Sequence, residues 1–266
     1  MHRQRPHAAG ETILETKALT KVFGGLTAVN AVDMQVHKGE ILSLIGPNGA
    51  GKTTVFNVVT GIYKPEQGQV FFKGKNITGR KPYKIVSFGI ARTFQNIRLF
   101  PDMTCLENVM AGQHCRSTSG LWRSLLKTPG QRAEEQRIRE IAETRLNQVN
   151  LGKAKDDLAK NIAYGAQRML EIARALASGP DLLVLDEPSS GLNPKETEDL
   201  MAFLKGLIAE DHVTILLIEH DMNMVMGISD WVVVLDEGRK IAEGKPEAIY
   251  TNQQVIEAYL GKDDGE

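Results

Sequence analysis

Two short apolar segments in the second half of the chain predict strands buried on both faces of a parallel sheet. They are Leu182 to Leu185 and Thr214 to Ile218, both rich in Leu, Ile and Val, as expected where helices cover the two faces of a sheet. A third apolar segment, Ile41 to Ile45, is also expected to be a strand. Because ligands bind at the carboxyl ends of strands in such sheets, we expect the chemistry in the residues that follow these segments.

Other segments predict a second, antiparallel sheet beside the parallel one. Ile13 to Leu19 and Ala31 to Val36 have strand-like composition. Gln69 to Phe72 is followed by a tight turn at Lys73-Gly74-Lys75 and a short return at Asn76-Ile77, which is typical of a hairpin.

Helical periodicity replaces the strand pattern from about Ile97 to Leu176. The charged stretch Gln131 to Asn147 lies within it, and apolar residues recur in that region at helical spacing: Ile138, Ile141, Leu146 and Val149. We therefore expect a helical insertion at about residues 97–176. The last part, from Val232 to Leu260, predicts a hairpin followed by helices. We expect residues 1–11 to be a flexible tail and residues 12–266 a single α/β domain with a mixed core sheet.

A glycine-rich loop directly follows the Ile41 to Ile45 segment and fits the pattern G-x-x-x-x-G-K-[ST]. In this pattern the glycines let backbone N–H groups approach phosphate oxygens, the lysine reaches the β- and γ-phosphates, and the hydroxyl residue ligates Mg²⁺. A helix that begins near Gly51 adds its positive end. A merely structural turn is the alternative, which the strand before the loop and the helix after it disfavour. The residues expected to hold ATP are Gly46, Pro47, Asn48, Gly49, Ala50, Gly51, Lys52, Thr53 and Thr54.

Two adjacent carboxylates, Asp186 and Glu187, end the Leu182 to Leu185 segment. Adjacent residues at a strand end point in different directions, so Asp186 can approach a metal ion while Glu187 faces the γ-phosphate and polarises an attacking water. Two solvated acids that cap a strand are the alternative. The phosphate loop upstream favours the catalytic interpretation.

Composition and charge exclude several classes of protein. The chain has 266 residues and a formal net charge of −1, which gives no electrostatic footprint for a general nucleic-acid binder. The two cysteines, Cys105 and Cys115, form no C-x-x-C pair, and we expect free thiols in a reducing cytosol. The segment Met1 to Glu11 has no apolar core of a signal peptide, and no stretch approaches the ~20 apolar residues that span a bilayer. We expect a protein that is neither secreted nor integral to a membrane.

In the order of these motifs the chain resembles the ATP-binding subunits of ABC transporters, which are P-loop NTPases. The resemblance implies that Gln95 belongs to the Q-loop, which joins the core to the helical insertion, and that His220 is the switch histidine. Taken alone, Gln95 would be a surface amide and His220 as often structural as catalytic. Phe23 lies where the family places an aromatic ring that stacks on adenine; a core phenylalanine is the alternative.

The family's signature segment is usually Leu-Ser-Gly-Gly-Gln, and the matching stretch here departs from it. Ile162-Ala163-Tyr164-Gly165-Ala166 keeps one glycine but lacks the serine hydroxyl and the glutamine. The resemblance implies that Ala163, Tyr164 and Gly165 face the γ-phosphate of ATP held by a second subunit, in front of a helix expected at Gln167 to Ala177. Ala163 cannot donate the side-chain hydrogen bond, which contributes about 0.5–1.5 kcal/mol in a neutral pair. We therefore expect the composite site that contains this signature segment to be the weaker of the two in the dimer. The D-loop has Asn193 where Asp is commoner.

Several further segments resemble the importers of branched-chain and other hydrophobic amino acids, and among these the longer of two paired ATPase subunits. The matching segments are Phe23 to Val29, Tyr164-Gly165, Leu170 to Arg174, Gly191 to Pro194 and Ile218 to Met222. The longer type has an extended segment, here about Cys115 to Gln136. The basic stretch from Arg116 to Arg139 is interpreted as a solvated helix face, with contact to a membrane subunit or to anionic headgroups as the alternative.

The resemblance also implies cofactors, partners and a location. ATP and Mg²⁺ are expected, with Thr53, Gln95 and Asp186 around the metal, and with Glu187, Gln95 and His220 as catalytic residues. The implied partners are transmembrane permease subunits, a second ATPase subunit in a heterodimer (a homodimer is the alternative) and, indirectly, a periplasmic or extracellular binding protein. The implied location is peripheral, at the cytoplasmic face of the plasma membrane. Alternatives are a lipopolysaccharide exporter, a soluble ABC protein of translation or DNA repair, and a P-loop kinase.

Overall fold

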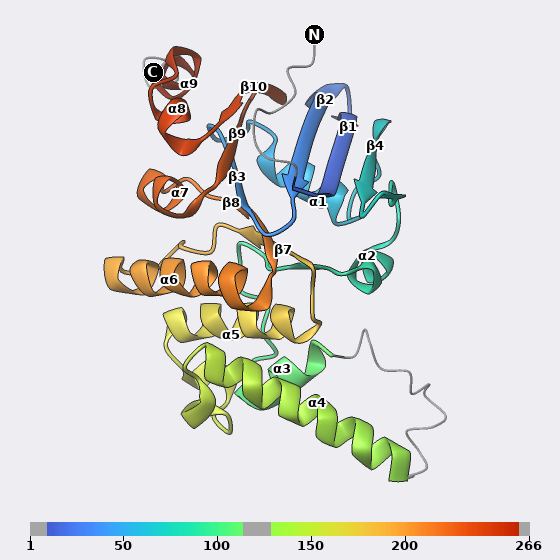
Figure 1. Cartoon of the computed structure of the whole chain (residues 1–266), viewed down its shortest axis with the longest axis vertical. Helices are drawn as coiled ribbons and strands as arrows, with labels where there is room; N and C mark the ends of the chain where they lie inside the picture. The colour runs from blue at the N-terminus through green and yellow to red at the C-terminus, as the bar shows by residue number, and fades with distance from the viewer. Residues whose placement is uncertain (1–9, 114–128, 261–266) are drawn as a thin grey trace.

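A computed structural model describes residues 10–113 and 129–260, in which two sheets pack beside a group of helices (Figure 1). The larger sheet has six strands in the order β10-β9-β3-β8-β7-β6. Strands β3, β6, β7, β8 and β9 are parallel and β10 is antiparallel to β9. The strands are β3 (Ile41–Ile45), β6 (Ile90–Arg92), β7 (Leu182–Asp186), β8 (Thr214–Ile218), β9 (Trp231–Asp236) and β10 (Arg239–Gly244).

The predicted parallel strands are confirmed. Every residue of β3, β7 and β8 is buried, which agrees with a sheet that is covered on both faces. Topology makes these strands neighbours in the order β3-β8-β7, so that the segments after their carboxyl ends meet at one edge.

The second sheet is antiparallel, as predicted, and has the order β2-β1-β4-β5. Its strands are β1 (Thr12–Phe23), β2 (Leu26–His37), β4 (Gln67–Phe72) and β5 (Lys75–Asn76). Strands β1 and β2 have 12 residues each and are longer than predicted. Register shifts interrupt their pairing, and Ala18 and Ala31 have positive φ there, so the alternation of polar and apolar residues breaks before the strands end.

Nine helices lie in the described part of the chain, and those of the middle segment pack on one another rather than on the small sheet. Helices α3, α4 and α5 share an apolar cluster that includes Leu106, Leu146 and Leu170, and they form the lower end of the molecule in Figure 1. The helices are α1 (Lys52–Val59), α2 (Pro82–Phe88), α3 (Cys105–Ala111), α4 (Pro129–Gln148), α5 (Tyr164–Ala177), α6 (Pro194–Asp211), α7 (Met222–Ile228), α8 (Pro246–Tyr250) and α9 (Gln253–Leu260).

Two apolar clusters hold the core sheet in place. One fills the space between the two sheets and contains Phe56 of α1, and the other packs α5 and α6 against the opposite face of the core sheet. Helix α5 begins at Tyr164, three residues before the predicted Gln167. The sequence Tyr164-Gly165 does not favour a helix, but both residues lie inside its first turn.

Candidate nucleotide-binding and catalytic site

The phosphate loop connects β3 to α1 and has the backbone conformation that its glycines permit. Gly46, Gly49 and Gly51 all have positive φ, which residues with a Cβ atom rarely adopt. A Cβ at Gly46 would also collide with the Leu235 carbonyl. Lys52 lies over the loop, where its Nζ donates hydrogen bonds to the carbonyls of Gly46 (2.6 Å) and Pro47 (2.9 Å). The loop thus presents backbone N–H groups, a helix N-terminus and an ammonium group together, an arrangement that suits a polyphosphate.

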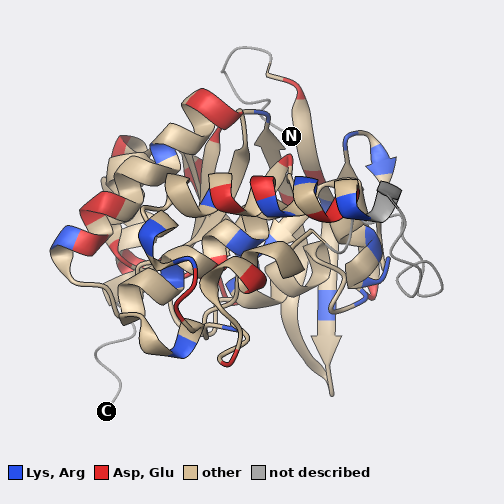
Figure 2. Cartoon of the chain, turned by 90° about the horizontal axis from the view of Figure 1, so that it is seen from below, with Lys and Arg blue, Asp and Glu red and all other residues tan. Residues whose placement is uncertain are grey.

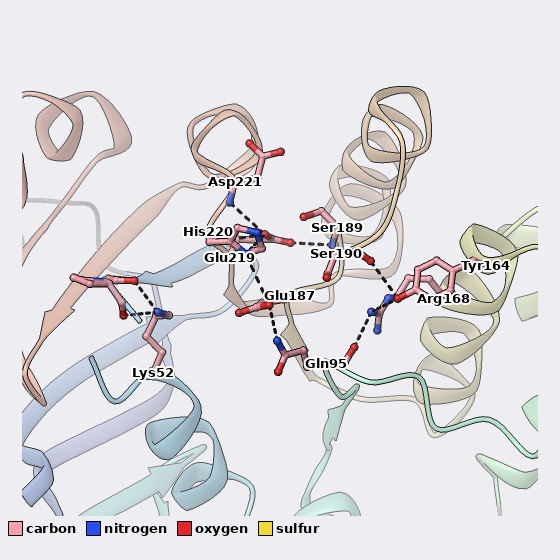
Figure 3. A network of polar contacts seen from close by, with 12 residues as sticks. Lys52, Gln95, Tyr164, Arg168, Glu187, Ser189, Ser190, Glu219, His220 and Asp221 are labelled. Atoms are coloured by element: carbon pink, nitrogen blue, oxygen red, sulfur yellow. Dashed lines mark hydrogen bonds and ion pairs between the residues drawn. The ribbon is translucent and has the colours of Figure 1, made fainter. Parts of the chain in front are cut away.

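The three strands on one side of β3, in the order β8, β7 and β6, are each followed by one of the predicted catalytic residues. His220 follows β8, Glu187 follows β7 and Gln95 follows β6. Gln95 Nε2 donates to Glu187 Oε2 at 2.9 Å, and His220 Nδ1 is 3.8 Å from the same oxygen (Figure 3). The fold therefore brings together three side chains that are up to 125 residues apart in the sequence, at the edge of the sheet where chemistry was predicted.

Glu187 has an unusual backbone conformation. Its φ is 47°, in the left-handed region, and its N–H donates to the Ile218 carbonyl at 2.9 Å. A residue other than Gly or Asn in this region is strained, and such strain persists only where the surroundings impose it. The bond to β8 is one such restraint, and it fixes where the Glu187 carboxylate points.

Asp186 is buried at the end of β7 and paired with an arginine that the sequence analysis missed. Arg92 Nη2 lies 2.8 Å from Asp186 Oδ2, and the same guanidinium donates to Asn57 and Thr60 of the α1 region. Burial raises the pKa of the Asp186 carboxyl, and the neighbouring Arg92 opposes that rise. Arg92 therefore ties the strand that precedes Gln95 to the carboxylate predicted to approach the metal.

The predicted metal ligands fit a magnesium ion. Thr53, Gln95 and Asp186 line one cavity of about 620 Å³ between the core sheet and the Q-loop. They offer a hydroxyl, an amide oxygen and a carboxylate, and Mg²⁺ is usually held by one or two carboxylates together with phosphate oxygens and water. Within residues 10–113 and 129–260 there is no group of three or more His, Cys, Asp or Glu side chains that would hold a metal without a phosphate ligand.

Phe23 is not a core residue. It is 39% exposed at the end of β1, its ring meets the Tyr63 ring edge-on at 5.1 Å, and Lys21 Nζ lies 4.8 Å from its centroid. These contacts disfavour the core alternative, and stacking on adenine stays a prediction.

The signature segment lies away from the phosphate loop of its own chain. Figure 3 shows Tyr164 and Lys52 on opposite sides of the Gln95–Glu187 pair. Ala163 is the residue before α5, and no side chain caps this helix. Gly165 is buried where a Cβ would meet Glu196 of α6. The signature residues Ala163, Tyr164 and Gly165 therefore lie apart from the phosphate loop of this chain, and their contact with the ATP of a second subunit stays a prediction.

Two further residues near the site have structural partners that the sequence did not reveal. The carboxylate of Glu219 is fully buried and accepts the N–H of Ser189 (2.9 Å) on one oxygen and of His220 (3.2 Å) on the other, so it joins the segments that follow β7 and β8. Asn193 caps α6 through a reciprocal capping box with Glu196. The only signal for Glu219 was a charged residue directly after an apolar run.

The charged and cysteine-containing segments are only partly described. Residues 114–128, which include Cys115 and most of the predicted basic stretch, lie outside the described residues, as do residues 1–9 of the expected tail. On α4 the charged residues are Arg and Glu, which are interspersed along the helix (Figure 2), and this favours a solvated face for that part. Cys105 is a buried free thiol. No helix in the described part of the chain is both long and apolar enough to cross a bilayer.

Comparison with known proteins gives the family. Residues 29–190 match the ABC transporter family, and residues 239–265 match a family described as branched-chain amino acid ATP-binding cassette transporter. The chain belongs to the ABC transporter family. Among its relatives is the high-affinity branched-chain amino acid transport ATP-binding protein BraF of Pseudomonas aeruginosa, 49% identical over 94% of this chain and 98% of BraF. Another is LivG of Escherichia coli (strain K12), with the same description, 46% identical over 95% of this chain and 99% of LivG.

Solved structures agree with this assignment. The crystal structure of a nucleotide-free ATP-binding cassette from an ABC transporter superimposes with a TM-score of 0.83 at 34% identity, over 96% of this chain and all of the other. A cassette in its ADP conformation superimposes with a TM-score of 0.82 at 33% identity, over 94% of this chain and 99% of the other. The predicted fold class and the resemblance to ATP-binding proteins of branched-chain amino acid transport are confirmed.

Proposed function

We propose that this chain is the ATP-hydrolysing subunit of an importer for branched-chain or other hydrophobic amino acids. The meeting of Gln95, Glu187 and His220 beside the phosphate loop supports hydrolysis. The transport named in the descriptions of BraF and LivG supports the solute class and disfavours the lipopolysaccharide exporter. Solute selectivity belongs to other subunits, so this chain supplies energy rather than recognition.

Each residue at the carboxyl edge of the sheet has a separate part in the chemistry. Lys52 and the loop N–H groups bind the β- and γ-phosphates, and Thr53, Gln95 and Asp186 are the residues that would hold Mg²⁺, which neutralises phosphate charge. Glu187 orients the attacking water or accepts its proton, because its carboxylate is the one that faces Gln95 and His220. His220 and Gln95 contact the γ-phosphate and the water.

A second ATPase subunit completes the site. Ala163 to Gly165 would face the γ-phosphate bound to the partner's phosphate loop. The partner's signature segment would face the γ-phosphate bound to the phosphate loop of this chain, so that closure of the dimer excludes water from both sites. A shorter paralogue in a heterodimer is the proposed partner. Transmembrane permease subunits dock on the ATPase pair at the cytoplasmic face of the membrane, a binding protein delivers the solute, and no nucleic acid is involved.

The decisive experiment separates ATP binding from hydrolysis in the assembled transporter. Glu187→Gln retains ATP affinity but lowers hydrolysis by about 10²–10⁴-fold, the usual contribution of a general base, and abolishes leucine uptake by cells that lack the native gene. Lys52→Ala loses ATP affinity itself. Glu198→Gln, on the exposed surface of α6, is the matched control and stays native. Hydrolysis at the native rate by Glu187→Gln would remove Glu187 from the proposed role.

A further inference from the structure

Arg168 is a fully buried cation that the mechanism above does not use. It lies in α5, five residues after Ala163, and none of its surface is exposed. Its guanidinium donates to two consecutive backbone carbonyls of the Q-loop. Nη1 donates to Phe94 O at 2.9 Å, and Nη2 donates to Gln95 O at 2.8 Å, the bond drawn in Figure 3. The planar fork of arginine suits this paired geometry, which the single ammonium of lysine does not reproduce.

The burial of Arg168 is compensated by one carboxylate on the same helix. Glu171 Oε2 lies 3.2 Å from Arg168 Nη1, while Glu171 Oε1 accepts the Arg98 N–H at 3.2 Å, farther along the Q-loop. Arg168 Nε is itself buried without a hydrogen-bond partner. Buried ion pairs seldom add net stability, because desolvation of the two charges offsets their attraction. The Arg168–Glu171 pair is therefore better explained by the position in which it holds the Q-loop backbone.

The contacts of Arg168 lead to both sides of Glu187. The carbonyl of Gln95 is held by Arg168, and the side chain of Gln95 reaches Glu187. On the other side, the Tyr164 hydroxyl lies 3.5 Å from Arg168 Nη2 and donates to the Ser190 carbonyl at 3.3 Å, three residues after Glu187. Helix α5, which starts at the signature segment, is thereby bonded to the segments before and after the proposed base.

We infer that Arg168 is a positioning residue that holds the Gln95 side chain against Glu187 and links this geometry to the signature helix of the same chain. This inference rests on the proposed function. When ATP on the partner subunit contacts the N-terminus of α5, the Phe94–Gln95 backbone moves with the helix. It does so because the buried Arg168 guanidinium is bonded to both carbonyls and cannot shift relative to them. Binding at one composite site then adjusts the catalytic geometry of the other.

The first test compares lysine substitutions at two arginines of α5 in the assembled complex. Arg168→Lys keeps the charge beside Glu171 and loses the fork, so we expect kcat for ATP to fall by about ten- to a hundredfold, the loss of one or two charge-assisted hydrogen bonds. The affinity for ATP stays within about threefold, because the phosphate loop is untouched. The control is Arg174→Lys, because Arg174 also lies on α5 near Glu171, at 3.9 Å, but its guanidinium stacks over the Phe100 ring; it keeps a native kcat.

A double-mutant cycle shows whether Arg168 acts through Gln95. In a Gln95→Ala background the further change Arg168→Lys should lower kcat by less than about twofold, because the group that it positions is gone. Independent, multiplicative losses would overturn the inference, as would a native kcat for Arg168→Lys. Tyr164→Phe, which keeps the ring and the fold, provides a variant for the case in which Arg168→Lys is unstable: its kcat should fall while its melting temperature stays native, and a native kcat contradicts the link.

The outcomes also separate this inference from the proposed function. If Glu187→Gln hydrolyses ATP normally, the assignment of the base fails whatever Arg168 does. If Glu187→Gln is inactive and Arg168→Lys is native, only the positioning role fails.

Discussion

At the scale of single residues, the site depends on buried polar groups whose partners lie far away in the sequence. Arg92 meets Asp186, and Glu219 meets Ser189. Such pairs cannot be predicted from hydrophobic periodicity, because the pattern indicates which residues are buried but not which of them contact one another. The phosphate loop and the Asp186-Glu187 pair were predictable because their function requires a local pattern, whereas the residues that position them were not.

Glu219 gives the first prediction at this scale. Glu219→Gln replaces one carboxylate oxygen with an NH₂ group that cannot accept an N–H, so either Ser189 or His220 loses its partner. We expect the free energy of unfolding to fall by about 1–3 kcal/mol, the cost of leaving a buried donor unsatisfied. Urea denaturation of the isolated chain measures it. An unchanged midpoint would show that the carboxylate is dispensable for joining the two segments.

Cys105 gives a prediction about pH. Burial raises the pKa of its thiol, with the Asp157 charge adding to the effect. A raised pKa in the folded state means that this group contributes stability below the unfolded thiol pKa and loses it as the pH rises through the folded value. In a Cys115→Ser variant, we expect alkylation of Cys105 at pH 8 to be at least about tenfold slower in the folded protein than in urea, since only the thiolate reacts. Equal rates in the two states would contradict the burial of this side chain.

At the scale of elements, strands were easier to predict than helix starts. The strands β3, β7 and β8 are continuous apolar runs with no competing interpretation, while β1 and β2 contain irregular pairing that hides their full length. Helix α5 began earlier than predicted because its first turn is stabilised by tertiary contact: the buried Gly165 lies against Glu196 of α6. Tertiary packing overrides weak local propensity in such positions.

The N-terminus of α5 supplies a test of the signature segment. Because Ala163 occupies the N-cap position, Ala163→Ser and Ala163→Asp should both raise the unfolding free energy of the nucleotide-free chain, by about 0.5–2 kcal/mol. The two variants differ when ATP is present, since a hydroxyl donates to a γ-phosphate and a carboxylate repels it.

Measurement of ATP-dependent association with the second ATPase subunit distinguishes the two effects. Ala163→Ser should strengthen this ATP-dependent association and Ala163→Asp should weaken it. Thermal melting without nucleotide should show both variants as more stable than the native chain. Equal association of both variants with the partner would place Ala163 outside the composite site.

At the scale of the whole molecule, the proposed composite sites each take a phosphate loop from one subunit and a signature segment from the other. Lys52 of the phosphate loop and Tyr164 of the signature segment lie on opposite sides of the Gln95–Glu187 pair (Figure 3), which agrees with the proposal that they serve different sites. The family resemblance predicted this arrangement from motif order. Helices α3, α4 and α5 pack together as a separate apolar cluster, and the signature segment lies at the start of α5. Helical periodicity suggested this cluster but did not show which helices share it.

The isolated chain is therefore expected to be a weak ATPase, monomeric or transiently dimeric. Co-expression with the shorter paralogue should give a stable heterodimer by pull-down and raise ATP turnover per chain by at least about tenfold, as completion of a catalytic site does. The heterodimer has one site with this chain's altered signature and one with the paralogue's, so their turnover rates should differ. Stable and fully active homodimers at low concentration would contradict this prediction.

The phosphate loop also depends on residues at the far end of the chain. The N–H of Gly238, in the turn between β9 and β10, donates to the carbonyl of Ala50 at 3.1 Å, and β3 itself pairs with β8 and β9. During synthesis, the loop leaves the ribosome long before these partners exist, and translation of the intervening chain takes roughly ten to forty seconds at about 5–20 residues per second. Over that interval β3 lacks both of its neighbours in the core sheet and the loop lacks its bond to Gly238. We therefore expect ATP to assist folding only after translation has almost finished.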